Sequence, residues 1–340
     1  MTDYRAFYLD RRVAITGGLG FIGSNLARKL VELGARVLLI DSLIPEYGGN
    51  SYNIEGIRER VHVNIADIRQ QSTMNYLVQG QDVIFNLAGQ VSHIDSMQDP
   101  YTDLEINCRS QLSLLEACRR NNPDVKVVYA GTRQVYGKPD TLPVTEGHLV
   151  RPTDVNGINK AAGEYYHLVY NNVFGVRACS LRLTNVYGPR QLLRHNRQGF
   201  IGWFVRLALE DREIEVFGDG RQIRDFVYVD DAADAFLRAG ASDECNGRVL
   251  NVGGMSPITH RELVELLIKA AGTGRFRMVD WPAERKAIDI GDFYADSTLI
   301  GQVLGWAPHT ALQEGFAQTF AYYRTCLDQY LPASGRATAP

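Results

Sequence analysis

The 340-residue chain lacks a marked excess of charge, because 36 lysines and arginines are balanced by 39 aspartates and glutamates, for a net charge of −3. This balance favours neither a nucleic-acid partner nor a membrane surface. The chain also shows no signal peptide and no apolar run long enough to span a bilayer. We therefore expect a cytoplasmic protein that is large enough to bury a substantial core.

Cysteines are few and scattered, at Cys108, Cys118, Cys179, Cys245 and Cys326. No Cys-x-x-Cys pair is present, so the spacing predicts no metal site. Three of the five lie within apolar helix or strand patterns, where we expect reduced thiols packed in the core.

The chain does have a glycine motif close to its N-terminus. An apolar strand pattern at 13–16 is followed by Gly17, Gly20 and Gly23 and then by a helical pattern. Glycines between a strand and a helix let backbone N–H groups approach the pyrophosphate of a dinucleotide. We therefore expect Gly17, Gly20, Phe21, Ile22 and Gly23 to bind such a cofactor. An ordinary tight turn is the alternative.

A second strand pattern, at 36–40, ends at Asp41. A carboxylate at this distance from the glycines accepts hydrogen bonds from a ribose 2′-hydroxyl and repels a 2′-phosphate. Asp41 therefore predicts NAD rather than NADP as the cofactor. The alternative is that Asp41 only caps the following turn.

Strand and helix patterns alternate along the first half of the chain. Further strand patterns lie at 61–65, 82–87, 126–130 and 177–183, with helical patterns at 73–79, 103–121 and 157–173. This alternation predicts an α/β fold with a doubly wound parallel (Rossmann) sheet. Because the pattern becomes irregular after residue 183, we expect those segments to close over a ligand at the carboxyl ends of the strands.

Further motifs follow in order along the chain. They are Asp67-Ile68, Asn86-Leu87-Ala88-Gly89, Asn107, Leu183 to Pro189, Gly218 to Asp231, Asn251 to Gly254 and Leu304 to Trp306. Together with the glycine motif, these motifs resemble those of an extended short-chain dehydrogenase/reductase of the sugar-nucleotide epimerase/dehydratase family. The resemblance covers about residues 10–330. The resemblance implies a homodimeric enzyme that binds NAD and a nucleotide-diphosphate sugar.

The resemblance also implies which residues contact each ligand. Beyond the glycine motif and Asp41, the expected NAD contacts are Asp67, Ile68, Leu87, Ala88, Asn107 and Lys160. The expected sugar-nucleotide contacts are Phe200 and, at the diphosphate, Asn185 and Arg224. Arg190 is also expected to contact phosphate, because its Pro-Arg pair follows Gly188 on a loop near the expected site. A solvated loop is the alternative for the basic cluster at 190–197.

The resemblance implies a smaller, discontinuous C-terminal substrate domain beside the sheet. We expect the NAD-binding domain at 1–183 and about 225–254, and the sugar-nucleotide-binding domain at about 184–224 and 255–331. Residues 332–340 are predicted to form a disordered tail.

Thr132 follows the strand pattern at 126–130, at the place where the family has a hydroxyl that bonds the reacting sugar. A threonine with no chemical role is the alternative. Arg133 and Gln134 then stand where the family's 4,6-dehydratases carry Asp-Glu as acid and base. Neither an arginine nor an amide is a useful proton shuttle at neutral pH. The pair therefore argues against 4,6-dehydration and favours 4-epimerisation through a transient 4-keto sugar.

The family's Tyr-x-x-x-Lys motif is incomplete, because Asn156 stands where the tyrosine is expected, four residues before Lys160. Lys160 is implied to hold the nicotinamide ribose. Asn156 can hold a hydroxyl but cannot take its proton. Either another group is the base, or the protein binds its ligands without turnover, or Asn156 is an engineered substitution.

His93 is the candidate for a replacement base, because it follows a strand pattern near the expected sugar pocket and imidazole titrates in the useful range. A structural histidine is the alternative. His167 is predicted to lie on the exterior of its helix.

Two other functions remain as alternatives to an epimerase. One is a dehydratase or decarboxylase with relocated catalytic groups, and the other is a non-catalytic binding protein.

Overall fold

The computed structural model describes residues 4–331, so the tail predicted at 332–340 lies outside the described residues. Its centre is a seven-stranded, entirely parallel sheet in the order β11-β6-β5-β4-β1-β2-β3. The strands are β1 (Arg12–Thr16), β2 (Arg36–Asp41), β3 (Val61–Ile65), β4 (Val83–Asn86), β5 (Lys126–Thr132), β6 (Arg177–Leu183) and β11 (Val249–Val252). The predicted doubly wound parallel sheet is confirmed.

One strand runs further than its sequence pattern predicts. β5 continues to Thr132 because Gly131 and Thr132 pair with Arg182 and Leu183 of β6. Gly131 also allows a close approach, since an added Cβ there would lie 2.6 Å from the Ser180 hydroxyl. The extension carries Thr132 to the carboxyl edge of the sheet.

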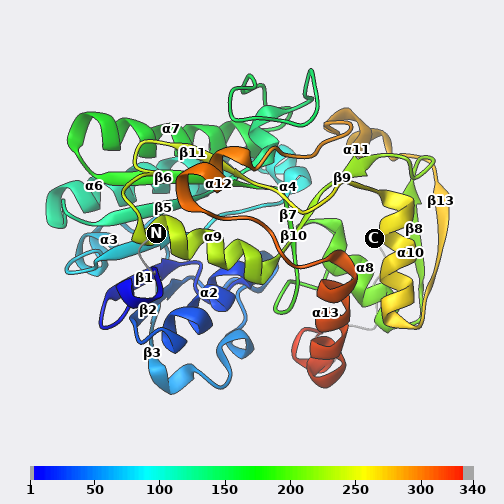
Figure 1. The fold of residues 1–340 in the computed structure, drawn as a ribbon, viewed down its shortest axis with the longest axis horizontal. Coiled ribbons are helices and arrows are strands. Elements are labelled where there is room, and N and C mark those ends of the chain that lie inside the picture. The colour runs from blue at the N-terminus through cyan, green and yellow to red at the C-terminus, as the bar shows by residue number, and fades with distance from the viewer. Residues whose placement is uncertain (1–3, 332–340) are drawn as a thin grey trace.

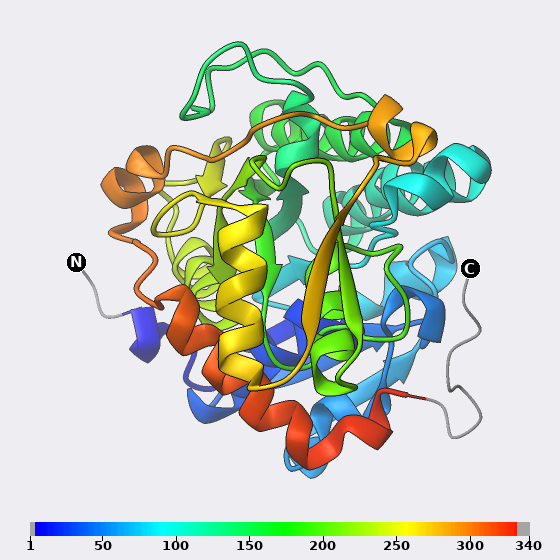
Figure 2. The same cartoon turned by 90° about the vertical axis from the view of Figure 1, so that its right-hand side faces the viewer.

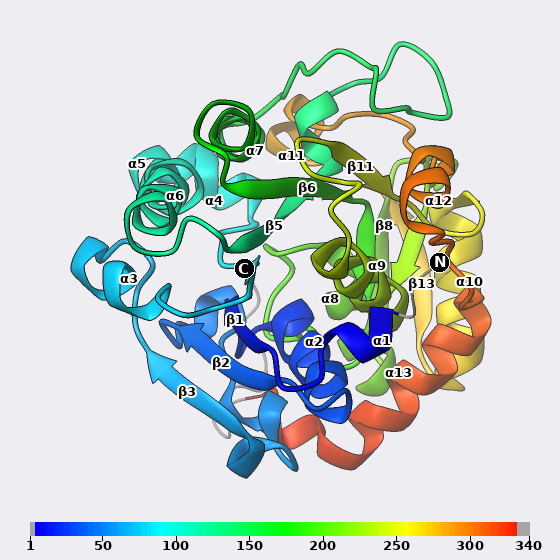
Figure 3. The ribbon, with the colours of Figure 1, turned by 60° about the vertical axis from the view of Figure 1, so that its left-hand side comes forward.

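Helices cover both faces of the sheet (Figure 3). On one face, α2 (Phe21–Glu32) packs against α9 (Val229–Ala241). On the other face, α6 (Ser110–Asn121) lies between α3 (Gln71–Leu77) and α7 (Val155–Phe174). No helix within residues 4–331 is long and apolar enough to cross a membrane.

The helix predicted at 103–121 is divided into three parts. α5 (Pro100–Leu104) begins earlier because the Asp99 carboxylate accepts the Thr102 N–H at 3.1 Å, and proline is well suited to a first helical turn. A wider π turn, η4 (Glu105–Arg109), separates α5 from α6. Such turns are rare and frequent at functional sites, and this one carries Asn107.

The later part of the chain forms a smaller layer beside the sheet (Figures 1 and 2). It contains α8 (Phe200–Leu209), β8 (Glu213–Phe217), α10 (His260–Ala271), β13 (Arg275–Val279) and α13 (Leu312–Cys326). Phe204, Leu267 and Phe316 belong to its separate apolar core. Between these elements the chain returns to the main sheet as α9 and β11, so the smaller layer is discontinuous in sequence.

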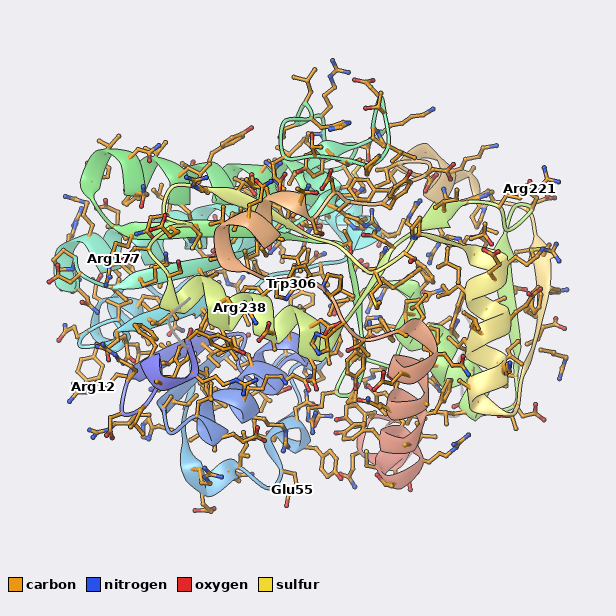
Figure 4. The ribbon with its side chains drawn as sticks, viewed as in Figure 1. Arg12, Glu55, Arg177, Arg221, Arg238 and Trp306 are labelled. Atoms are coloured by element: carbon orange, nitrogen blue, oxygen red, sulfur yellow. The ribbon has the colours of Figure 1, made fainter. Side chains whose placement is uncertain are left out.

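The remaining helices and strands are short. They are α1 (Tyr4–Phe7), α4 (His93–Gln98), β7 (Asn185–Tyr187), β9 (Ile223–Arg224), β10 (Phe226–Tyr228), β12 (Ile258–Thr259), α11 (Ala283–Ala287) and α12 (Thr298–Leu304). After α12, Trp306 donates to the Asp231 carbonyl at 3.0 Å, and Arg238 donates to the Gly305 carbonyl at 3.0 Å (Figure 4). These bonds fix the segment after α12 on helix α9.

Candidate active site

A cavity of about 810 Å³ opens at the carboxyl ends of the sheet strands. Segments that follow β1 to β6 line one side, and α8, β8 and the segment around α11 line the other. The strand order reverses between β1 and β4, which is where ligands bind in open α/β sheets. The cavity therefore lies where the sequence predicts a ligand.

The glycine motif forms a cradle at the start of α2. Gly17 has a φ of +70°, and a Cβ added to Gly23 would lie 2.2 Å from the Gly17 carbonyl oxygen. Gly20 is the N-cap and offers no side chain to the first N–H groups of the helix. The cradle fits a dinucleotide pyrophosphate, which accepts such N–H groups at a helix N-terminus.

Asp41 lies at the end of β2 and lines the cavity. Its carboxylate accepts N–H groups from Leu19 at 2.9 Å and Leu43 at 2.8 Å, so it also caps the following turn. Burial raises the pKa of the carboxyl group, while the two hydrogen bonds act in the opposite direction. Turn capping and a role toward a ribose are therefore compatible.

We expect NAD to bind at least about tenfold more tightly than NADP, because a 2′-phosphate beside Asp41 meets a like charge. Asp41→Asn should narrow this difference and affect NAD less. Calorimetric titration of both proteins with both dinucleotides measures it. Equal affinities of the unmodified protein for NAD and NADP would contradict this role of Asp41.

The other predicted NAD contacts divide into two groups. Asp67, Ile68, Leu87, Ala88 and Lys160 line the cavity. Asn107 lies behind Lys160, where its amide donates to the Gln90 carbonyl at 2.8 Å and to Asp103 at 3.0 Å. Asn107 therefore supports the cavity wall.

Asn156 and Lys160 share one face of α7, as the i, i+4 spacing predicts. The helix begins at Val155, two residues before the prediction, because the Asp154 carboxylate caps the Gly157 N–H at 2.7 Å. Lys160 is 5% exposed, and burial lowers the pKa of its ammonium group to about 8. A Cβ added to Gly89 would lie 2.6 Å from Lys160 Nζ, so the glycine leaves space for the ammonium group.

Thr132 lines the cavity at the end of β5, and its hydroxyl oxygen accepts the Gln134 N–H at 3.2 Å. Arg133 donates to the Asn185 side chain at 3.1 Å, and burial lowers the pKa of its guanidinium to about 9. Gln134 donates to Asp154 at 2.9 Å. Positions 133 and 134 thus hold neutral or cationic groups with structural partners, and no acid–base pair.

His93 also lines the cavity, and a residue that sequence reasoning missed holds it in place. His93 Nδ1 lies 2.9 Å from Asp154 Oδ2, and the Asp154 side chain has no exposed surface. Burial alone would raise the pKa of Asp154, but the nearby His93 imidazole and the hydrogen bond from the Gly157 N–H outweigh it and keep the pKa low. The pair places an imidazole beside a buried carboxylate in the cavity wall, which is the arrangement of other His–Asp pairs.

Asn156 belongs to a buried polar network that the sequence motifs did not predict. Its amide nitrogen donates to the Gln90 carbonyl at 2.8 Å and to Asp103 at 2.9 Å. Gln90 and Asp103 are 2% and 1% exposed. Neither residue belongs to a recognisable motif. Asp154 is different, because an aspartate just before a helical pattern is a typical N-cap, and the sequence could have predicted that role.

The prediction that His167 lies on the helix exterior is wrong. Its side chain is fully buried, stacked on Tyr129 with ring centroids 4.5 Å apart. Nδ1 donates to the Gly163 carbonyl at 2.7 Å, and Nε2 accepts from Asn86 at 3.2 Å. Burial lowers the pKa of His167 to about 4, so the imidazole is neutral and structural.

Three of the four predicted substrate contacts, Asn185, Phe200 and Arg224, line the cavity. Arg224 is 4% exposed and lies 3.3 Å from Asp289. Arg190 is not among the lining residues. Its guanidinium donates to Asn25 at 2.7 Å and lies 4.9 Å from the centre of the Tyr322 ring.

Comparisons with known proteins agree with this geometry. Residues 13–253 match the model of the NAD dependent epimerase/dehydratase family. The chain is 34% identical to a putative UDP-glucose 4-epimerase of Methanocaldococcus jannaschii, covering 89% of this chain and 95% of the relative. It is 32% identical to a dTDP-glucose 4,6-dehydratase of Streptomyces griseus, covering 93% and 94%.

A solved structure is similar over the same length. The UDP-glucose 4-epimerase of Thermotoga maritima, determined with UDP-glucose, superposes with a TM-score of 0.83 at 29% identity, covering 93% of this chain and 99% of that chain. The motifs, the cradle and the matched length lead to one conclusion. The chain is a member of the NAD-dependent epimerase/dehydratase family of nucleotide-sugar enzymes.

Proposed function

We propose that the protein is an NAD-dependent nucleotide-sugar epimerase that acts at C4 of the sugar through a transient 4-keto sugar. The observation that carries the proposal is the His93–Asp154 pair in the wall of the same cavity as Thr132 and Lys160. It supplies an oriented base where the family's tyrosine is absent. The similarity to proteins named UDP-glucose 4-epimerase supports the choice.

Each residue has one task in this proposal. Bound NAD supplies the acceptor, and later the donor, for the hydrogen on C4. Thr132 holds the 4-hydroxyl through a hydrogen bond, His93 Nε2 takes its proton as C4 is oxidised, and Asp154 stabilises the imidazolium. Lys160 holds the nicotinamide ribose. The keto sugar then rotates in the cavity. His93 returns the proton to the 4-oxygen, and the product is the opposite C4 epimer.

Two rival functions can be distinguished from an epimerase by the products that form. A 4,6-dehydratase or decarboxylase would accumulate a keto sugar, but Arg133 and Gln134 offer it no acid–base pair. A binding protein without turnover is favoured by Asn156, which cannot replace a phenol as base.

The test incubates the protein with UDP-glucose, UDP-N-acetylglucosamine, UDP-glucuronate and dTDP-glucose in turn and identifies the products by NMR. Formation of the C4 epimer supports the proposal, whereas a keto product, or no reaction with any of these nucleotide sugars, contradicts it.

Arg224→Ala should weaken nucleotide-diphosphate binding about ten- to a hundredfold and leave NAD affinity nearly unchanged. The side chain is the buried cation at the substrate end of the cavity, and a lost charged hydrogen bond costs about 1.5–3 kcal/mol. Calorimetry with UDP and with NAD measures both affinities. A fall in NAD affinity with UDP affinity retained would place Arg224 on the other ligand.

The proposed enzyme is a homodimer. Ile158, Tyr165, Val169 and Val173 are 48–66% exposed and are spaced seven, four and four residues apart on α7, so they form one apolar face of the helix. A second copy of the same helix is the partner that such a self-complementary stripe fits. Val169→Glu should shift the protein toward monomers in sedimentation equilibrium, with the exposed Lys269→Glu as control. An unmodified protein that is monomeric at micromolar concentration would contradict the dimer.

A further inference from the structure

Asp103 is a buried carboxylate without a direct ion pair, although its charge favours the ammonium form of the nearby Lys160. It lies on α5 and is 1% exposed, and no basic side chain of residues 4–331 forms an ion pair with it. Three side-chain amides satisfy it instead. Oδ1 accepts from Asn159 at 2.8 Å, and Oδ2 accepts from Asn107 at 3.0 Å and from Asn156 at 2.9 Å. A buried carboxylate is tolerated only with such complete hydrogen bonding.

This arrangement fixes the orientation of the Asn156 amide. One hydrogen of Nδ2 is directed at Asp103 and the other at Gln90, whose backbone carbonyl lies 2.8 Å away. Both partners only accept hydrogen bonds, so the amide nitrogen must face them. A flipped amide would place its oxygen against a carboxylate and a carbonyl. The amide nitrogen therefore faces Asp103 and Gln90, and the amide oxygen does not.

The oxygen of the same amide is left for a ligand. Asn156 Oδ1 accepts no hydrogen bond from the described residues, and Asn156 lines the cavity with Thr132, His93 and Lys160. A tyrosine at this position has a single O–H donor for the two acceptors that now hold the amide. The two N–H groups of the Asn156 amide therefore satisfy both Asp103 and Gln90, which one tyrosine hydroxyl could not do.

We infer that Asp103 is a positioning residue, which turns the Asn156 carbonyl oxygen toward the bound nucleotide sugar as a fixed hydrogen-bond acceptor. This inference rests on the proposed function. A fixed acceptor bonds a hydroxyl and repels a ketone oxygen, so its partner is a sugar hydroxyl that stays protonated throughout the reaction. That hydroxyl is a neighbour of the 4-hydroxyl and is not the 4-hydroxyl itself. Position 156 thus selects the substrate, while the proton moves elsewhere.

Two variants and a matched control test the inference. Asn156→Ala removes the acceptor, and Asp103→Asn lets the neighbouring amides rotate. Asn159→Ser removes another hydrogen bond to the same carboxylate and leaves both partners of the Asn156 amide in place. We measure the affinities of all proteins for NAD, UDP-glucose and dTDP-glucose by calorimetry, kcat and KM where turnover occurs, and folding by thermal unfolding.

Asn156→Ala and Asp103→Asn should each weaken nucleotide-sugar binding about fivefold, and together no more than either alone. NAD affinity should be unchanged in Asn156→Ala, and Asn159→Ser should bind as the unmodified protein does. A fall in NAD affinity in Asn156→Ala would instead assign the acceptor to the nicotinamide ribose and overturn the inference. Full nucleotide-sugar affinity in folded Asp103→Asn would also overturn it.

Failure of the proposed function would look different. Binding of a nucleotide sugar without turnover would contradict the epimerase, while the affinities of the variants would still decide the role of Asp103. Binding of neither nucleotide sugar to the unmodified protein would contradict both.

Discussion

His93→Ala should lower kcat by about 10²–10⁴-fold while the protein still binds NAD, because it removes the proposed general base. The imidazole lines the cavity, with Nδ1 2.9 Å from the buried Asp154 carboxylate. Steady-state kinetics and calorimetric titration with NAD measure the two quantities.

Asp154→Asn is the matched variant, since it keeps the shape of the side chain and removes the charge that stabilises the imidazolium. It should lower kcat and leave NAD affinity nearly unchanged, because the imidazolium formed in the reaction loses its carboxylate partner. Steady-state kinetics and calorimetry with NAD measure both quantities. A His93→Ala protein with unchanged kcat would exclude His93 as the base.

Lys160→Ala should lower kcat by about 10²-fold or more and should also weaken NAD binding, because its ammonium holds the ribose and acts in a site with little water. Lys160→Arg keeps the charge and should retain more activity than Lys160→Ala. Since the pKa of Lys160 is lowered to about 8, the ammonium form is lost as the pH rises through about 8. We therefore expect activity to fall above that pH.

This fall in activity at alkaline pH identifies the ammonium group of Lys160. In Lys160→Arg the fall above about pH 8 should disappear, because an arginine stays charged. Rate profiles of the two proteins, with calorimetric NAD titrations at both ends of the range, separate binding from catalysis. An alkaline fall that persists in Lys160→Arg would belong to another group.

Local patterns in the sequence predicted the sheet and the parts of the cavity wall that single segments form. The spacing of Asn156 and Lys160 predicts a shared helix face, and the glycine motif predicts the cradle at α2, because both depend on residues close in sequence. The partners Asp103 and Gln90 were missed. They lie 53 and 66 residues from Asn156, and only the packing of α5 and α7 beside β4 brings them together. Neither stands in a recognisable motif.

Arg190 and His167 show a second limit. A basic residue after a glycine-proline turn predicts phosphate contact, but Arg190 is held by Asn25 and Tyr322. The polarity of His167 predicts an exposed position, but neighbouring backbone and amide groups satisfy its ring. In both cases long-range partners decide where a polar side chain lies, and these cannot be read from one segment.

The fate of the hydrogen on C4 tests the central claim most directly. A C4-deuterated form of the nucleotide sugar that the protein turns over is converted in the presence of an unlabelled nucleotide sugar, and the products are analysed by NMR and mass spectrometry. The account predicts that the inverted product carries its deuterium at C4, with none lost to water. Deuterium exchanged into solvent, accumulation of a keto sugar, or no conversion by NAD-loaded protein would contradict it.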